Sequence, residues 1–139
     1  MSSEDAYDVR PGVPSVEHYR RLRTHAGLSD RSPEGAALGL ASTWYGVTAF
    51  QGGEPVGMSR VVGDGGCFFQ VADICVLPGH QGRGLGRRIM QALTDELELR
   101  APAHSCVSLI ADAHHLYRKF GFTDTAPDSI CMARFLPAA

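Results

Sequence analysis

The longest regular pattern in the chain is a stripe of apolar residues at helical spacing. Four leucine or isoleucine side chains recur at every fourth position: Leu85, Ile89, Leu93 and Leu97. This spacing places them on one face of a helix, and the stripe is wide enough to face a core. We therefore predict a long amphipathic helix whose first turn covers residues 84–88.

Two shorter helices are predicted nearer the start of the chain. Ser15 is a residue type that caps helices, an apolar stripe follows it, and Gly27 stands where the helix should end. The stripe consists of Val16, Tyr19, Leu22 or Arg23, and Ala26. Ser32-Pro33-Glu34 begins a second, weaker helix that runs through Leu40, with proline in its usual first-turn position.

Short apolar runs separated by glycine-rich turns predict the strands. Before the long helix these runs cover residues 7–10, 44–50, 55–62 and 67–77, and the last three form an antiparallel meander. After the long helix, residues 105–110 form a buried strand, so a strand–helix–strand crossover joins two parallel strands. A short helix follows at residues 113–120, and a strand at residues 130–135 closes the sheet. The pattern predicts an α/β (α+β) fold with a mixed, mostly antiparallel sheet.

The turn into the long helix carries the most informative residues. A strand ending in Asp73-Ile74-Cys75-Val76 leads into a glycine-rich segment with three arginines, Arg83, Arg87 and Arg88. These arginines crowd a helix N-terminus, where the helix dipole is already positive, and acidic residues crowd the opposite end. A bound anion would remove this conflict, because the uncapped N–H groups, the dipole and the arginines would all attract it. The segment therefore predicts a phosphate-binding site.

Two common phosphate-binding loops do not fit this segment. A Rossmann fingerprint beginning at Gly82 needs glycine or alanine at Arg87, and a P-loop beginning at Gly79 needs lysine at Leu85. The remaining pattern is Gln-x-x-Gly-x-Gly, formed by Gln81, Gly84 and Gly86. It resembles the acetyl-CoA pyrophosphate loop of the GNAT N-acetyltransferase superfamily. The alternative is a glycine turn that only links a strand to a helix.

A second motif supports the resemblance. Leu116-Tyr117-Arg118-Lys119-Phe120-Gly121-Phe122 is similar to the late helix of that superfamily and the turn after it. The resemblance covers residues 43–135 and implies one GNAT domain over residues 1–139. It also implies transfer of an acetyl group from acetyl-CoA to a primary amine, by direct attack in a ternary complex.

The resemblance assigns the cofactor-binding residues. The backbones of Ile74, Cys75 and Val76 would pair with pantetheine. The pyrophosphate would lie on the loop and the first helical turn, which comprise Gln81, Gly82, Arg83, Gly84, Leu85, Gly86, Arg87 and Arg88. For Arg83 and Arg88 an ordinary solvated arginine is an alternative.

The resemblance also assigns catalytic candidates. Tyr117 would protonate the departing CoA thiolate, and the alternative is a half-buried aromatic residue. Asp73 is a base, an anchor for the substrate ammonium or a structural hydrogen-bonding residue. Gln70 stands where some relatives place a glutamate base, and an amide cannot serve as one.

The chain departs from the family pattern just before Tyr117. Only Ala113, His114 and His115 separate Ala111-Asp112 from Leu116, whereas relatives often have about five residues there. The shortening would shift Tyr117 by about half a helical turn. It would also bring the two histidines toward the site, where one could act as an acid or base, and a surface or capping histidine is the alternative.

Composition limits the remaining choices. The 139 residues, 44% of them hydrophobic, suffice for one ordinary core and not for two domains. A net charge of −2 argues against a nucleic-acid-binding protein. Without an apolar N-terminal run or a membrane span, the chain is predicted to be soluble and cytoplasmic. The sequence specifies no dimer interface, although dimers are common among relatives.

Neither cysteine nor histidine placement predicts further chemistry. The four cysteines, Cys67, Cys75, Cys106 and Cys131, lie within or beside apolar stretches and are expected to be reduced core residues. The six histidines are scattered, so no metal site is expected. The acceptor is expected to be a small-molecule amine. The alternatives are a protein N-terminus or lysine as acceptor, or a non-catalytic acyl-CoA sensor.

Overall fold

The computed structural model describes residues 6–111 and 114–137, apart from the side chains of residues 114 and 115. Contacts within the chain define two compact units, residues 1–109 and residues 110–139. The first unit contains the sheet and the three longer helices, and the second contains helix α4 (His114–Arg118). A single domain over residues 1–139 stays a prediction.

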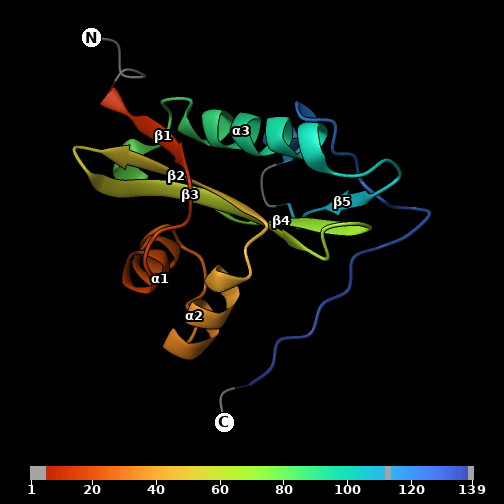
Figure 1. The fold of residues 1–139 in the computed structure, drawn as a ribbon, viewed down its shortest axis with the longest axis horizontal. Helices are drawn as coiled ribbons and strands as arrows, with labels where there is room; N and C mark the ends of the chain where they lie inside the picture. Colours follow the sequence, from red (N-terminus) through yellow and green to blue (C-terminus); the bar gives the residue numbers. More distant parts are fainter. Residues whose placement is uncertain (1–5, 112–113, 138–139) are drawn as a thin grey trace. The chain divides into compact units, whose positions relative to one another are not determined.

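The sheet of the first unit has five strands in the order β1-β2-β3-β4-β5 (Figure 1). The strands are β1 (Asp8–Pro11), β2 (Tyr45–Gln51), β3 (Glu54–Gly63), β4 (Phe68–Val76) and β5 (Cys106–Ser108). The first four pair in antiparallel fashion, and β5 runs parallel to β4. Helix α3 (Leu85–Arg100) connects these two parallel strands. The predicted mixed, mostly antiparallel sheet with a β-α-β crossover is therefore confirmed.

The predicted helices form where their capping residues indicated. The Ser15 hydroxyl accepts a hydrogen bond from the His18 N–H and begins α1 (Val16–His25). Ser32 caps α2 (Pro33–Ala41) in the same way. Helices α1 and α2 lie on one face of the sheet and α3 lies on the other (Figure 1). The sheet thus has a helical layer on each side.

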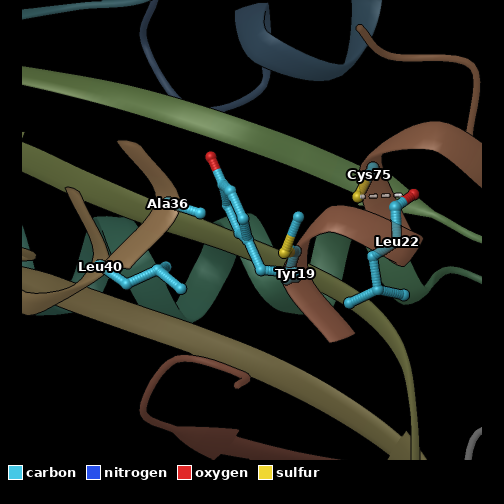
Figure 2. Packing of buried hydrophobic residues seen from close by; sticks show 6 residues of the cluster. Tyr19, Leu22, Ala36, Leu40 and Cys75 are labelled. Atoms are coloured by element: carbon cyan, nitrogen blue, oxygen red, sulfur yellow. Dashed lines mark hydrogen bonds between the residues drawn. The ribbon is translucent and has the colours of Figure 1, made fainter. Parts of the chain in front are cut away.

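Both layers bury the apolar faces that the sequence predicted. On α3 the buried residues are Leu85, Ile89, Met90, Leu93 and Leu97. On the other face, residues from α1, α2, β3 and β4 form one cluster, which comprises Tyr19, Leu22, Ala36, Leu40, Met58 and Cys75 (Figure 2). A large apolar side chain gains about 1.5–3 kcal/mol on full burial, so these two faces anchor the helices to the sheet.

Strand β4 is irregular in a way that matters for the site. Between the pairs Met58↔Cys75 and Arg60↔Ala72, β4 contains one residue more than β3. The strand therefore bulges at Asp73, which has a φ of +63°, a left-handed conformation that is uncommon outside glycine. Strand β5 pairs with β4 only along Phe68–Gln70. In the described parts of the chain, no strand continues along that edge of β4 after Gln70.

Two strand predictions need correction. The strand predicted at residues 105–110 covers only Cys106–Ser108. The strand predicted at residues 130–135 is wrong, because this segment has no strand pairing and Ile130, Met132 and Phe135 are 72%, 86% and 80% exposed. Alternating apolar residues form a strand only where another strand edge bonds to their backbone groups.

The cysteine prediction is correct in part. All four cysteines are free, and Cys75 is buried as expected. Cys67, Cys106 and Cys131 are exposed instead. Cys67 and Cys106 lie at the starts of β4 and β5, and Cys131 lies in the segment that does not pair. Apolar residues beside a cysteine in the sequence therefore did not indicate that the cysteine itself is buried.

Candidate cofactor and active site

The glycine-rich segment forms a turn that leaves the start of α3 uncapped. A short 3-10 helix, η2 (Pro78–His80), precedes it. Gly82 and Gly84 have φ values of +77° and +76°, which glycine adopts without a steric cost. Gly84 is the N-cap of α3 and has no side chain with which to cap the helix, and no acidic residue occupies the first turn. The first backbone N–H groups of α3 are thus presented to a ligand.

The side chains of the loop are held at both of its ends. The Gln81 Nε2 group donates to the Val76 carbonyl at 3.0 Å and ties the loop to the end of β4. Arg83 Nη1 donates to the Tyr7 hydroxyl at 3.1 Å, and that hydroxyl lies 2.8 Å from His80 Nδ1. Arg87 is exposed in the first turn of α3. The structure therefore places arginines from the loop and from the helix beside one helix N-terminus.

The predicted cofactor strand, Ile74 to Val76, follows the bulge, and no strand among the residues that the structure describes pairs with its outer edge. Because β5 stops pairing at Gln70, backbone groups of β4 beyond that point can pair with an extended ligand. The Cys75 side chain takes no part in this pairing, because its Sγ lies in the core and contacts the Leu22 carbonyl at 3.9 Å (Figure 2). Burial raises the pKa of the Cys75 thiol to about 12, so the thiol is protonated near neutral pH and is no nucleophile.

Asp73 is the centre of a buried ionic cluster. Arg23 Nη1 donates to Oδ1 and Arg60 Nε donates to Oδ2, both at 2.5 Å. The Tyr19 hydroxyl also donates to Oδ1, at 3.0 Å. The side chains of Asp73, Arg23 and Arg60 are only 5%, 7% and 15% exposed. The cluster joins α1, β3 and the bulge of β4.

The surroundings of this cluster shift two pKa values. Burial, and then the negative charge and hydrogen bond of Asp73, raise the pKa of Tyr19. Burial lowers the pKa of Arg60, but the hydrogen bond and charge of Asp73 outweigh it, so the net shift is upward. Both carboxylate oxygens of Asp73 thus accept charge-assisted hydrogen bonds. Of the three roles considered for Asp73, these contacts favour the structural one.

Sequence reasoning did not identify Arg23 and Arg60 as the partners of Asp73. A signal was present, because a carboxylate in a mostly apolar strand needs buried donors. Arg23 also occupies a position in the apolar stripe of α1, where an arginine is unusual. Together, these two anomalies could have predicted the pair. Nothing in the local sequence pointed to Tyr7, which lies more than seventy positions from its partners.

Tyr117 lies in α4 of the second unit, and its side chain is buried. Its carbonyl accepts hydrogen bonds from the N–H groups of Phe120 and Phe122, and Gly121 has a φ of +87°. The motif thus forms a helix followed by a tight turn, as the sequence indicated. The distance of Tyr117 from a thioester stays a prediction, and Asp112, Ala113 and the side chains of His114 and His115 lie outside the described residues.

Two other kinds of feature are absent from the residues that the structure describes. No three histidine, cysteine, aspartate or glutamate side chains among them lie close enough together to bind a metal ion. None of the helices in residues 6–111 and 114–137 combines the length and the apolar character needed to cross a bilayer. The loop and the bulge of β4 therefore remain the principal candidates.

Comparison with known proteins gives one family. A model described as acetyltransferase (GNAT) domain matches residues 42–124. A Staphylococcus aureus protein of unknown function, described as a probable acetyltransferase, is 39% identical, with a TM-score of 0.89 over 94% of this chain and 99% of that chain. An Escherichia coli GNAT family N-acetyltransferase in complex with CoA has the same fold, with 21% identity and a TM-score of 0.64 over 87% of this chain and 71% of that chain.

Two curated relatives match shorter stretches. A streptothricin acetyltransferase from Streptomyces lavendulae is 37% identical over 62 residues, which are 42% of this chain and 33% of the relative. Serotonin N-acetyltransferase 2 from Oryza sativa is 39% identical over 80 residues, which are 56% of this chain and 38% of the relative. The chain therefore spans about a third of the length of these curated relatives.

Proposed function

Because the GNAT domain model covers more than half of its length, this chain belongs to the GNAT acetyltransferase family, and we propose that it transfers acetyl from acetyl-CoA to a primary amine of a small molecule. One observation carries this proposal. The start of α3, which has no side-chain cap and is flanked by arginines, is the next long element after β4, and no strand in the described residues pairs with the outer edge of β4 after Gln70. A ligand with a pyrophosphate and an amide-containing arm fits both features together.

In the proposed complex, the backbone of Ile74, Cys75 and Val76 pairs with the pantetheine amides. The N–H groups of the loop and of the first turn of α3 hold the pyrophosphate, assisted by Arg83 and Arg87. The Leu85 side chain is buried, so this residue would contribute through its backbone. This arrangement would satisfy the N–H groups of the first turn of α3, which have no acceptor within the helix.

The proposed reaction is a direct displacement. The neutral amine nitrogen attacks the thioester carbon, and a backbone N–H of β4 stabilises the negative charge on the carbonyl oxygen. The C–N bond forms, the C–S bond breaks, and Tyr117 gives its proton to the thiolate. The nitrogen loses its extra proton to solvent or to one of the histidines before Tyr117, because Gln70 cannot accept it and Asp73 is engaged by two guanidinium groups. Tyr117 then regains a proton from solvent.

The two curated relatives support a small-molecule acceptor, since their names specify streptothricin and serotonin. Each matches only part of this chain, so an activity screen is needed to identify the acceptor. A panel of small amines and of peptides with free N-termini or lysines would be tested for CoA release. Release with peptides alone would make this chain a protein acetyltransferase, and acetyl-CoA binding without release by any amine would make it a sensor.

Cofactor binding can be tested without knowing the acceptor. We expect acetyl-CoA and CoA, but not NAD, to raise the melting temperature of the protein. A ligand at a hundredfold excess over Kd adds about 2.7 kcal/mol, which corresponds to several degrees in a domain of this size. Gly84→Glu should abolish this shift, because a carboxylate at the helix N-terminus repels the phosphates.

Gly65→Glu is the matched control for this variant. Gly65 also has a left-handed φ, +81°, and no atom lies within 4 Å of a Cβ placed there. Both variants therefore place a glutamate at a left-handed φ and add the same charge. Equal acetyl-CoA affinity in Gly84→Glu and Gly65→Glu would contradict the assignment of the loop. Tyr117→Phe should retain that affinity and lose most amine-dependent CoA release.

A further inference from the structure

A small polar cluster connects the loop from Gln81 to Arg88, here called the phosphate loop, to the segment before β1. It consists of Tyr7, His80 and Arg83. Tyr7 lies immediately before β1, and its side chain is 5% exposed. Its ring packs edge to face against the His80 ring, with 5.6 Å between the centroids. A buried side chain from a distant segment thus reaches both ends of the turn that precedes α3.

One of the two hydrogen bonds at the Tyr7 hydroxyl has a fixed direction, and the other depends on the tautomer of His80. Arg83 can only donate, so the hydroxyl oxygen accepts from Arg83 Nη1 at 3.1 Å. The hydroxyl proton can then be donated to His80 Nδ1, which lies at 2.8 Å. In the neutral imidazole this leaves the ring proton on Nε2. The tyrosine hydroxyl is therefore fully used in holding these two side chains.

Arg83 needs such support because of its position in the backbone. It lies between two glycines that both have left-handed φ values, Gly82 and Gly84. Glycine gives a chain more conformational freedom than any other residue, and a long arginine side chain loses rotamer freedom when a ligand fixes it. The contact with Tyr7 uses one of the five guanidinium donors. A side chain ordered in advance binds its ligand more tightly than one that must be ordered on binding.

We propose that Tyr7 is a positioning residue of the phosphate loop, which orders Arg83 for contact with the pyrophosphate of the cofactor. This inference rests on the proposed function, because it takes the loop to be the pyrophosphate site. Tyr7 itself need not touch the ligand. His80 completes the arrangement by fixing the Tyr7 hydroxyl from the other side.

The test is Tyr7→Phe, which keeps the ring against His80 and removes only the hydroxyl. We expect the Kd for CoA and the KM for acetyl-CoA to rise about tenfold, the effect of losing a hydrogen bond to a charged group. The kcat at saturating acetyl-CoA should change by less than about twofold, because the reacting atoms are unaffected. Tyr45→Phe is the matched control, and its Kd should equal that of the wild type.

A double-mutant cycle with Arg83→Ala separates positioning from a general effect on the fold. If Tyr7 acts through Arg83, adding Tyr7→Phe to Arg83→Ala should hardly weaken CoA binding further. A full additional loss in that background would overturn the proposal, and so would an unchanged Kd in Tyr7→Phe alone. If the wild type does not bind CoA, the proposed function itself fails, which is a distinguishable result.

Dephospho-CoA identifies the phosphate concerned. It retains the pyrophosphate and lacks the 3′-phosphate, so Tyr7→Phe should weaken its binding by the same factor as for CoA. An effect that disappears with dephospho-CoA would overturn the assignment to the pyrophosphate.

Discussion

Two groups of arginines in this protein illustrate opposite uses of the same side chain. Arg23 and Arg60 are buried, and both bind the Asp73 carboxylate. Arg83 and Arg87 are exposed beside the uncapped start of α3, where the first turn holds no carboxylate among the described residues. The positive charge of the first group is neutralised in part by the Asp73 carboxylate. The second adds positive charge where the helix dipole is already positive.

The difference indicates which features would distinguish an arginine that stabilises the fold from one that is available to a ligand. In the Asp73 cluster the charges are desolvated, so their separation from a partner is costly and the cluster fixes the fold. At the start of α3 the arginines are hydrated, and their mutual repulsion costs little until an anion replaces the water. We therefore expect substitutions in the first group to change stability and substitutions in the second to change ligand affinity.

The largest expected effect is that of Asp73→Asn on stability. Asparagine tolerates the left-handed φ of this position, so the substitution removes mainly the charge. It leaves two buried guanidinium groups without a counter-ion, and the expected loss is about 3–5 kcal/mol in the free energy of unfolding. Urea unfolding measures this loss. In the control Asp30→Asn, whose exposed carboxylate pairs with Arg20, we expect almost no change. Equal losses of unfolding free energy in Asp73→Asn and Asp30→Asn would contradict the structural role of the Asp73 cluster.

The next effect is that of Arg87→Ala on CoA affinity. The loss of one charge-assisted contact should raise the Kd for CoA about tenfold, while the free energy of unfolding stays nearly constant. Isothermal titration calorimetry and urea unfolding measure the two quantities. Arg21→Ala, which removes an exposed arginine from α1, is the control and should leave the Kd unchanged. A large loss of stability in Arg87→Ala would place Arg87 in the structural group instead.

The last expected effect is absent near neutral pH and concerns the decline of stability at alkaline pH through Cys75. Its folded pKa of about 12 lies above the usual value of 9.0 because of burial and, to a lesser extent, the charge of Asp73. The thiol thus favours the folded state fully below pH 9, and this contribution falls as the pH rises from 9 toward 12, by about 1.4 kcal/mol per unit. Cys75→Ala should flatten this decline in urea unfolding at alkaline pH. The exposed Cys67→Ala should not, and identical profiles would argue against burial of Cys75.

The sequence predicted most of the first unit because its signals are local. Apolar spacing, Ser15 and Ser32 as caps, and paired glycines each act within a few residues. The Gln81 to Arg88 loop could be found for the same reason, since the strand, turn and helix that form it are adjacent in the chain. The GNAT resemblance then supplied what the pattern could not, namely a specific anion to propose for this loop.

The features that the sequence did not predict depend on contacts between distant residues. Arg23 reaches Asp73 across fifty positions, and Tyr7 reaches Arg83 across seventy-six. The strand expected at residues 130–135 failed for a related reason, because its apolar alternation specifies a face but not a partner edge. A single sequence records such pairs only as anomalies, such as a carboxylate in an apolar strand.

The short pairing between β4 and β5 has a consequence for the behaviour of the unliganded protein. A strand edge with unpaired N–H and C=O groups is a template on which another chain can add a strand. In the apo state, the edge of β4 after Gln70, with which no described strand pairs, would therefore be a place for self-association. A pantetheine arm lying along it would act as a removable edge strand, so cofactor supply would govern the colloidal stability of the protein as well as its catalysis.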